Sequence, residues 1–92
     1  MTLLTPDQVE AQLAATPGWV LADGRIVRKV TRSDFGDALR YVNAVGYLAE
    51  KASHHPDITI SWNEVTLSLV SHSAGGLTDQ DFDLARSVSS LD

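Results

Sequence analysis

Apolar residues recur every three or four positions in three segments, and this spacing predicts three helices. The first helix begins at Thr5-Pro6, because threonine can cap a helix and proline suits its first turn, and it ends at Pro17-Gly18. The second covers residues 35–52 after a cap at Ser33 or Asp34. The third begins at Thr78, whose hydroxyl can cap it.

The 35–52 helix carries a wider apolar stripe than packing on one sheet face requires. Tyr41, Ala44 and Leu48 lie beside the main stripe and widen it. The pattern is compatible with a thick core helix and equally with a helix that also contacts a partner chain.

Between the helices the period changes to two, which predicts two β-hairpins. Residues 19–22 and 25–30 form the first, joined by an Asp-Gly dipeptide that tolerates the positive φ of a tight turn. In the second, apolar residues alternate with threonine and serine over residues 58–62 and 65–69, with a turn at Asn63-Glu64.

His72 follows the second hairpin. By parity it shares a face with Thr66, Ser68 and Val70, unless a bulge intervenes. Gly75-Gly76 then breaks the strand. Glycines at such a turn allow a flat ligand to approach the backbone closely.

The predicted order of elements is α-β-β-α-β-β-α. Two hairpins separated by a helix favour an α+β fold, with a four-stranded antiparallel sheet and the helices packed on one face. A chain of 92 residues with 43% hydrophobic content predicts a single domain, residues 1–92, with a modest core. Because so small a core is marginal and the sheet has two open edges, we expect a homo-oligomer, either a dimer or a tetramer.

The charge balance and the lack of cysteine exclude several classes of protein. Seven basic against twelve acidic residues give a net charge of −5, so no positive stripe for nucleic acid is present. The absence of cysteine excludes disulfides and thiolate metal sites, and it fits the cytosol. The N-terminus lacks the features of a signal peptide and no apolar stretch approaches membrane-spanning length, so we predict a cytoplasmic protein without membrane contact.

The three histidines, His54, His55 and His72, lie within one short part of the chain. Histidine titrates closest to neutral pH, so such a cluster can move protons without a cofactor. Glu50 lies four residues before His54 and would face it if the helix continues that far, fixing its tautomer and favouring its protonated form. Pro56 takes His55 out of helical geometry, so the adjacent rings should diverge.

Other interpretations of these residues compete. A single histidine at the boundary of an element is more often a surface or capping residue, but three in one cleft favour a site. A three-histidine zinc site is an alternative, although adjacent histidines seldom bind one ion together, and we expect neither metal nor cofactor. For Asp81, the first interpretation is a carboxylate that caps a helix, and the second is a partner of a histidine. Trp19 and Trp62 are each core residues more often than stacking walls.

The stretch from Glu50 to Asp81 follows one spaced pattern: Glu-x-x-x-His-His-Pro, an aromatic position six residues beyond the proline, then His-x-x-x-Gly-Leu-Thr-x-x-Asp. This pattern resembles that of the pterin-4a-carbinolamine dehydratases, a family also known as the dimerisation cofactor of a homeodomain transcription factor. The similarity extends over essentially the whole chain and includes Gly18-Trp19 at the entry to the first strand.

The resemblance implies a hydro-lyase that dehydrates 4a-hydroxytetrahydropterin to the quinonoid dihydropterin, which recycles a tetrahydrobiopterin-type cofactor. By motif matching, His54 and His72 are the proton-transfer pair, His55 mainly holds and orients the pterin, and Glu50 orients an imidazole. The candidates for substrate contact are Ser53, His54, His55, Val70, Ser71, His72, Ser73, Trp19 and Asp81.

The chain departs from the family pattern at two positions. Ser53 stands where several members carry aspartate, and Ile58 replaces an aromatic residue found in some.

The alternative function is a non-catalytic dimerisation or coactivator module that binds another protein through the 35–52 helix.

Overall fold

The computed structural model describes residues 2–92, and the order of its elements is the predicted α-β-β-α-β-β-α. A short 3-10 helix, η1, lies between the last strand and the last helix. The elements are α1 (Pro6–Ala14), β1 (Val20–Ala22), β2 (Arg25–Thr31), α2 (Phe35–Ala52), β3 (Asp57–Ser61), β4 (Glu64–Leu69), η1 (His72–Ala74) and α3 (Asp79–Ser89).

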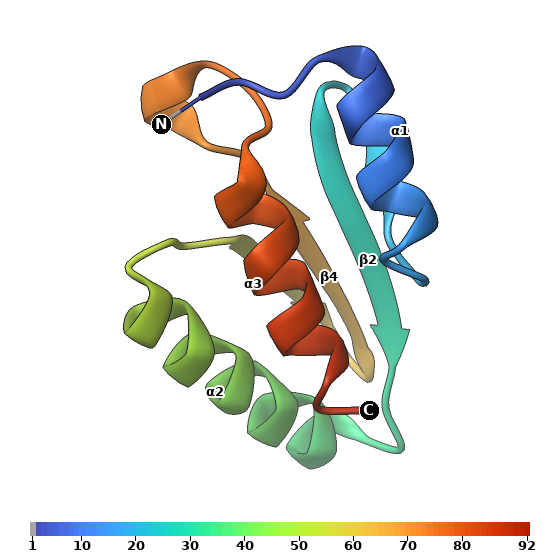
Figure 1. The fold of residues 1–92 in the computed structure, drawn as a ribbon. Coiled ribbons are helices and arrows are strands. Elements are labelled where there is room, and N and C mark those ends of the chain that lie inside the picture. The colour runs from blue at the N-terminus through green and yellow to red at the C-terminus, as the bar shows by residue number, and fades with distance from the viewer. Residues whose placement is uncertain (1) are drawn as a thin grey trace.

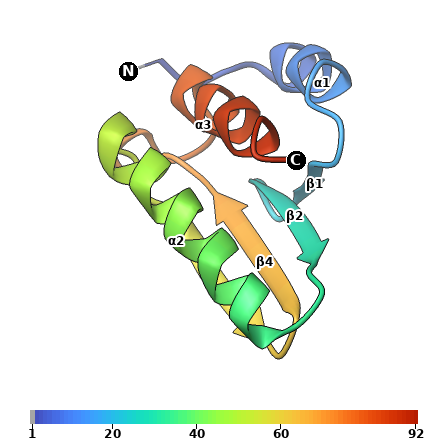
Figure 2. The ribbon, with the colours of Figure 1, turned by 90° about the horizontal axis from the view of Figure 1, so that it is seen from below.

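The four strands form one sheet in the order β1-β2-β4-β3, and all neighbours are antiparallel. The three helices lie on one side of this sheet, with α2 and α3 in contact over the β4 side and α1 beside β2 (Figures 1 and 2). Val65, Leu67 and Leu69 of β4 are completely buried, whereas the residues between them are only half-buried. This alternation confirms an α+β fold with one covered sheet face.

Helix caps were predicted correctly because they depend on local sequence. Thr5 accepts a hydrogen bond from the Gln8 N–H, and the Gln8 side chain accepts one from the Thr5 N–H, so the capping box of α1 is complete. Thr78 caps α3 in the same way, with Asp81 as the returning side chain.

Several predicted boundaries differ from the structure by a few residues, and three of the differences affect the interpretation. The first strand begins at Val20 rather than at Trp19. The β3–β4 turn is Trp62-Asn63, because Trp62 takes a positive φ of 53° and Glu64 already pairs with the neighbouring strands. β4 ends at Leu69, so His72 lies in η1 and the parity argument for its face was wrong.

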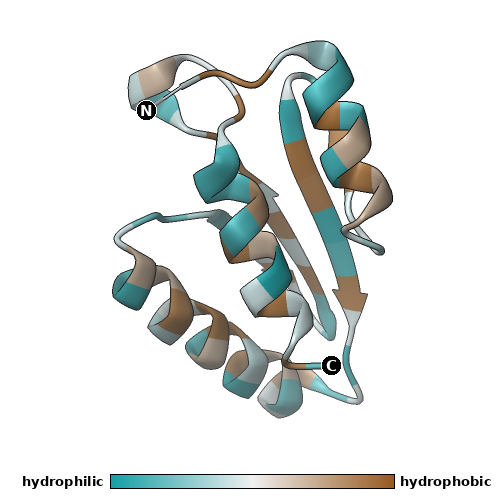
Figure 3. Ribbon diagram, in the orientation of Figure 1, coloured by the Kyte–Doolittle hydropathy of each residue, from teal (hydrophilic) through white to brown (hydrophobic). Residues whose placement is uncertain are grey.

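α2 divides its wide apolar stripe between two environments. Ala38, Val45 and Ala49 are buried in the core, but Phe35 and Leu39 remain exposed. Figure 3 shows that hydrophobic residues recur along α2 and α3 and along β2, with hydrophilic residues between them. The helix therefore carries more apolar surface than its own core uses.

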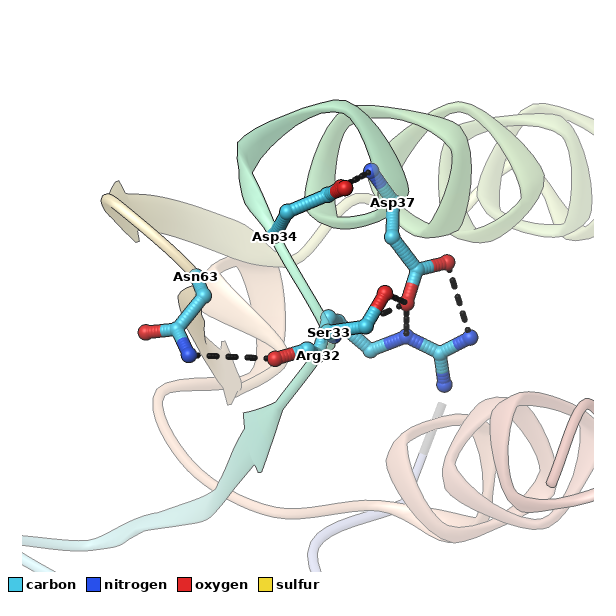
Figure 4. Close-up of polar contacts among 5 residues, drawn as sticks. All are labelled: Arg32, Ser33, Asp34, Asp37 and Asn63. Atoms are coloured by element: carbon cyan, nitrogen blue, oxygen red, sulfur yellow. Dashed lines mark hydrogen bonds and ion pairs between the residues drawn. The ribbon is translucent and has the colours of Figure 1, made fainter.

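The start of α2 is attached to the strands beside it (Figure 4). Asp34 caps the helix by accepting from the Asp37 N–H at 2.7 Å, and the Asn63 side chain donates to the Arg32 carbonyl at 3.0 Å. The Ser33 N–H, the Arg32 guanidinium and the Ser33 hydroxyl all donate to Asp37, and they lower the pKa of its carboxyl from 3.8 to about 2. These contacts hold one end of α2, and the histidines follow its other end.

None of the helices in residues 2–92 is long and apolar enough to cross a membrane.

Candidate functional site

The site begins where α2 ends. Ser53 takes a left-handed conformation, with φ 51° and ψ 40°, and the N–H groups of Ser53 and His54 both donate to the Ala49 carbonyl. A left-handed residue with this bond pattern terminates a helix and turns the chain away from its axis. His54 and His55 therefore leave the helix in different directions, as their position beside Pro56 predicts.

His54 turns toward the first turn of α3. Its Nε2 lies 2.5 Å from Oδ1 of Asp81, and the exposed fractions of the two side chains are 11% and 0%. A charge-assisted hydrogen bond removed from water in this way is strong and orients the imidazole ring. The carboxylate that holds His54 is thus Asp81.

Glu50 was expected to face His54, and the structure corrects this. Oε2 of Glu50 lies 2.6 Å from Nε2 of His55 instead. The reason is that the helix stops at Ala52, so the four-residue spacing does not extend to His54. The exposed fractions in the Glu50–His55 pair are 78% and 64%, and an ion pair so open to water contributes little to stability.

Asp81 uses its second oxygen for two further bonds. Oδ2 accepts from the Ser71 hydroxyl at 2.9 Å and from the Thr78 N–H at 3.0 Å. The side chain therefore acts both as the capping carboxylate of α3 and as the partner of His54, so both interpretations of Asp81 hold.

His72 lies on a closed loop after β4. The Ser71 N–H donates to the Gly76 carbonyl at 3.0 Å, which closes the loop around η1. Gly75 has a φ of +78°, and a Cβ on Gly76 would lie 3.0 Å from Cδ2 of Leu3, so both glycines serve the shape of this loop. His72 itself is exposed at its start.

These segments enclose a pocket of about 290 Å³ that all three histidines line. It is small, and its wall combines the end of α2, the loop after β4 and the start of α3. The lining residues are Ser53, His54, His55, Val70, Ser71, His72, Ser73 and Gln80. Seven of the nine predicted substrate contacts are among them, and Asp81 supports the wall from behind His54.

Gln80 also lines the pocket and was not among the predicted site residues. The available signal was its position in the first turn of α3, next to Asp81, but only the packing of α3 against the end of α2 brings it to the pocket.

The structure does not bring Trp19 to this pocket. Trp19 is buried in the core, where its Nε1 donates to the Ser89 hydroxyl at 3.2 Å. Trp62 is exposed in the β3–β4 turn, at the opposite end of β4 from His72. Neither tryptophan is a stacking wall here.

No other feature of the described residues matches the histidine pocket as a site for proton transfer. The described residues contain no group of three or more histidine, aspartate or glutamate side chains placed to hold a metal ion. A larger hollow of about 540 Å³ lies between α1 and β1, but it is lined by apolar residues and glycines with Glu10 as its one ionisable group. Proton transfer needs titratable groups, so the smaller histidine pocket is the better candidate.

A sequence model of the family described as "Pterin 4 alpha carbinolamine dehydratase" matches residues 2–91. The chain belongs to the pterin-4a-carbinolamine dehydratase family. Its members are hydro-lyases that act on pterins, so the protein is a dehydratase.

Relatives and a solved structure agree with this membership. An Acidobacterium capsulatum protein assigned as a pterin-4-alpha-carbinolamine dehydratase is 50% identical over 91 residues, which cover 99% of each chain. A relative from Thermosynechococcus vestitus with the same assignment is 46% identical over 96% of this chain and 93% of its own. A crystal structure described as a transcriptional coactivator/pterin dehydratase from Brucella melitensis superposes with a TM-score of 0.93 at 30% identity, covering 98% of both chains.

Proposed function

We propose that this dehydratase converts 4a-hydroxytetrahydropterin to the quinonoid dihydropterin by histidine acid/base catalysis. The observation that carries the proposal is the pocket lined by His54, His55 and His72, with one of these rings held by a buried carboxylate.

The chemistry needs one acid and one base. The bond between C4a and its hydroxyl breaks, and the hydroxyl leaves as water after it receives a proton from an imidazolium. A base removes the proton from N5, and the electron pair of that N–H bond forms the C4a=N5 double bond. Hydroxide is a poor leaving group, so the proton donor determines the rate of bond cleavage.

His54 is suited to one of these two tasks. A carboxylate can only accept, so a proton must lie on the Nε2 that faces Asp81. In the neutral ring this leaves a lone pair on Nδ1, which can take up and release a proton. Asp81 thus has the role of an orienting group for a catalytic histidine.

We assign His72 as the second proton-transfer residue and His55 as the residue that holds the substrate. His72 comes from a different segment of the wall, so it can approach the pterin from another side than His54. His55 is exposed and paired with Glu50, which suits a binding role, and Glu50 supports His55 in this scheme.

The test is a direct dehydratase assay with freshly generated 4a-hydroxytetrahydropterin, measured above the spontaneous rate. Alanine at His54 or His72 should lower kcat by ~10²-fold or more, because each removes a proton-transfer group. Alanine at His55 should mainly raise KM, because binding common to the ground and transition states is lost. Equal, mild effects of all three changes on kcat would contradict these roles.

A second candidate function rests on the exposed apolar residues of α2. Phe35, Leu39 and Tyr47 are all exposed large hydrophobic side chains on this helix. They support the alternative of a dimerisation or coactivator module that binds another chain through α2. Leu39→Glu would separate the two functions, since it should abolish association through α2 and leave the histidine pocket intact. The cytoplasmic location also remains a prediction.

A further inference from the structure

We infer that Ser71 and Thr78 are positioning residues which, through Asp81, determine the ring nitrogen of His54 that faces the substrate. The inference rests on the proposed function and deepens it. Ser71 also lines the pocket, but both side chains are buried, and their part in this arrangement is to orient Asp81.

The three side chains form a buried group behind His54. The exposed fractions of Ser71, Thr78 and Asp81 are 2%, 1% and 0%. Oγ of Ser71 lies 2.8 Å from Oγ1 of Thr78 and 2.9 Å from Oδ2 of Asp81. Their donors and acceptors therefore have to be satisfied by one another.

The direction of each hydrogen bond follows from the number of protons that each group can donate. The carboxylate of Asp81 only accepts, so Ser71 gives its single hydroxyl proton to Oδ2. Thr78 must then donate its own hydroxyl proton to Ser71, and its Oγ1 accepts from the Gln80 N–H at 3.3 Å. Every donor in the chain points toward Asp81.

This directed chain determines which oxygen of Asp81 faces His54. The Thr78 N–H is a second donor to Oδ2, so this oxygen receives two hydrogen bonds, and hydrogen bonds in series strengthen one another. With Oδ2 saturated, Oδ1 is the oxygen left for Nε2 of His54. The proton on Nε2 and the open Nδ1 of His54 thus follow from the hydrogen bonds of two buried hydroxyls.

The same group also links the two segments that carry the proposed proton-transfer residues. Ser71 immediately precedes His72, and its backbone closes the loop that carries His72. Its side chain joins that loop to the cap of α3 and, through Asp81, to His54. Loss of the Ser71 hydroxyl should therefore affect the relative position of both histidines.

The test compares two pairs of variants in the full chain. Ser71→Ala removes the buried hydroxyl, and Ser87→Ala removes an exposed hydroxyl of α3 that does not line the pocket. Thr78→Val removes the Thr78 hydroxyl at constant size, and Thr78→Ser keeps it. Nitrogen-15 NMR of the His54 ring, without substrate, reports the tautomer independently of activity.

We expect Ser71→Ala and Thr78→Val to move part of the neutral His54 population to the Nδ1-protonated tautomer. The kcat of both should fall by roughly 10-fold or more with little change in KM, as is usual for residues that orient an active group. Ser87→Ala and Thr78→Ser should keep the tautomer and stay within about twofold of the wild type.

An unchanged tautomer and kcat in folded Ser71→Ala protein would overturn the inference, and so would an equal loss in Thr78→Ser. If Thr78→Val fails to fold, the tautomer and kcat of Ser71→Ala are sufficient to test the inference. If the tautomer changes as expected but the wild type has no dehydratase activity, the proposed function fails while the positioning role stands.

Discussion

Asp81→Asn separates the structural and catalytic roles of the most buried carboxylate in the site. Asparagine has the same shape, so its carbonyl oxygen can replace Oδ2 and still accept from Ser71 and from the Thr78 N–H. Its NH₂ group then replaces Oδ1 and becomes a donor toward His54. His54 must accept through Nε2, so its proton moves to Nδ1 and the open nitrogen can no longer act as a base.

The expected loss of stability is modest. Two charge-assisted hydrogen bonds become neutral ones, which removes about 1 kcal/mol each, and the third reverses its direction. Part of this loss is offset because a buried charge is no longer desolvated. We therefore expect the free energy of unfolding to fall by about 1–2 kcal/mol, which leaves a domain of ordinary stability almost entirely folded.

The expected loss of activity is larger. Removal of a positioned acid or base typically costs ~10²-fold or more in rate, which corresponds to about 3 kcal/mol of activation free energy. Chemical denaturation and the dehydratase assay measure the two effects separately on one sample. Asp79→Asn is the matched control, because Asp79 lies in the same turn of α3 but is exposed.

Two results would refute this reasoning about Asp81. A folded Asp81→Asn protein with kcat within about threefold of the wild type would show that His54 does not depend on the carboxylate. Equal losses in Asp79→Asn and Asp81→Asn would show that the charge at the start of α3, rather than the contact with His54, matters.

Four further predictions follow from other parts of the molecule. Burial raises the pKa of Tyr41, and its hydroxyl has no hydrogen-bond partner among residues 2–92. Because this buried hydroxyl is unsatisfied, Tyr41→Phe should stabilise the protein by about 1–2 kcal/mol, measured by thermal unfolding. Tyr47 is exposed, so Tyr47→Phe is the control and should change stability little. Because the pKa of Asp37 falls from 3.8 to about 2 on folding, its contribution to stability is complete above the unfolded value and is lost as the pH falls toward the folded one. The stability difference between wild type and Asp37→Asn should therefore shrink over that pH range, and a constant difference would count against the assignment. Light scattering should show a homodimer or larger assembly, and Leu39→Glu should reduce it to single chains, because the exposed face of α2 then carries a charge. Chelation should leave dehydratase activity unchanged, and loss of activity restored by one metal ion would contradict catalysis by histidine alone.

Local features of this protein could be predicted from sequence because they depend on residues a few positions apart. The capping boxes at Thr5 and Thr78 use hydrogen bonds between residues three positions apart. The two hairpins follow from a period of two, and the histidine motif from its spacing. The periodic patterns were sufficient for the order of elements, and the family resemblance of the histidine motif supplied most of the pocket lining.

The tertiary structure decided which carboxylate each histidine meets. Glu50 is the near neighbour in sequence, but a left-handed residue at Ser53 ends the helix and places Glu50 against His55. Asp81 lies 27 residues beyond His54 and reaches it only because α3 packs against α2. No short-range period describes a contact of that length, so the sequence determined the local elements and the set of proton-carrying groups, whereas the packing of helices determined their pairing.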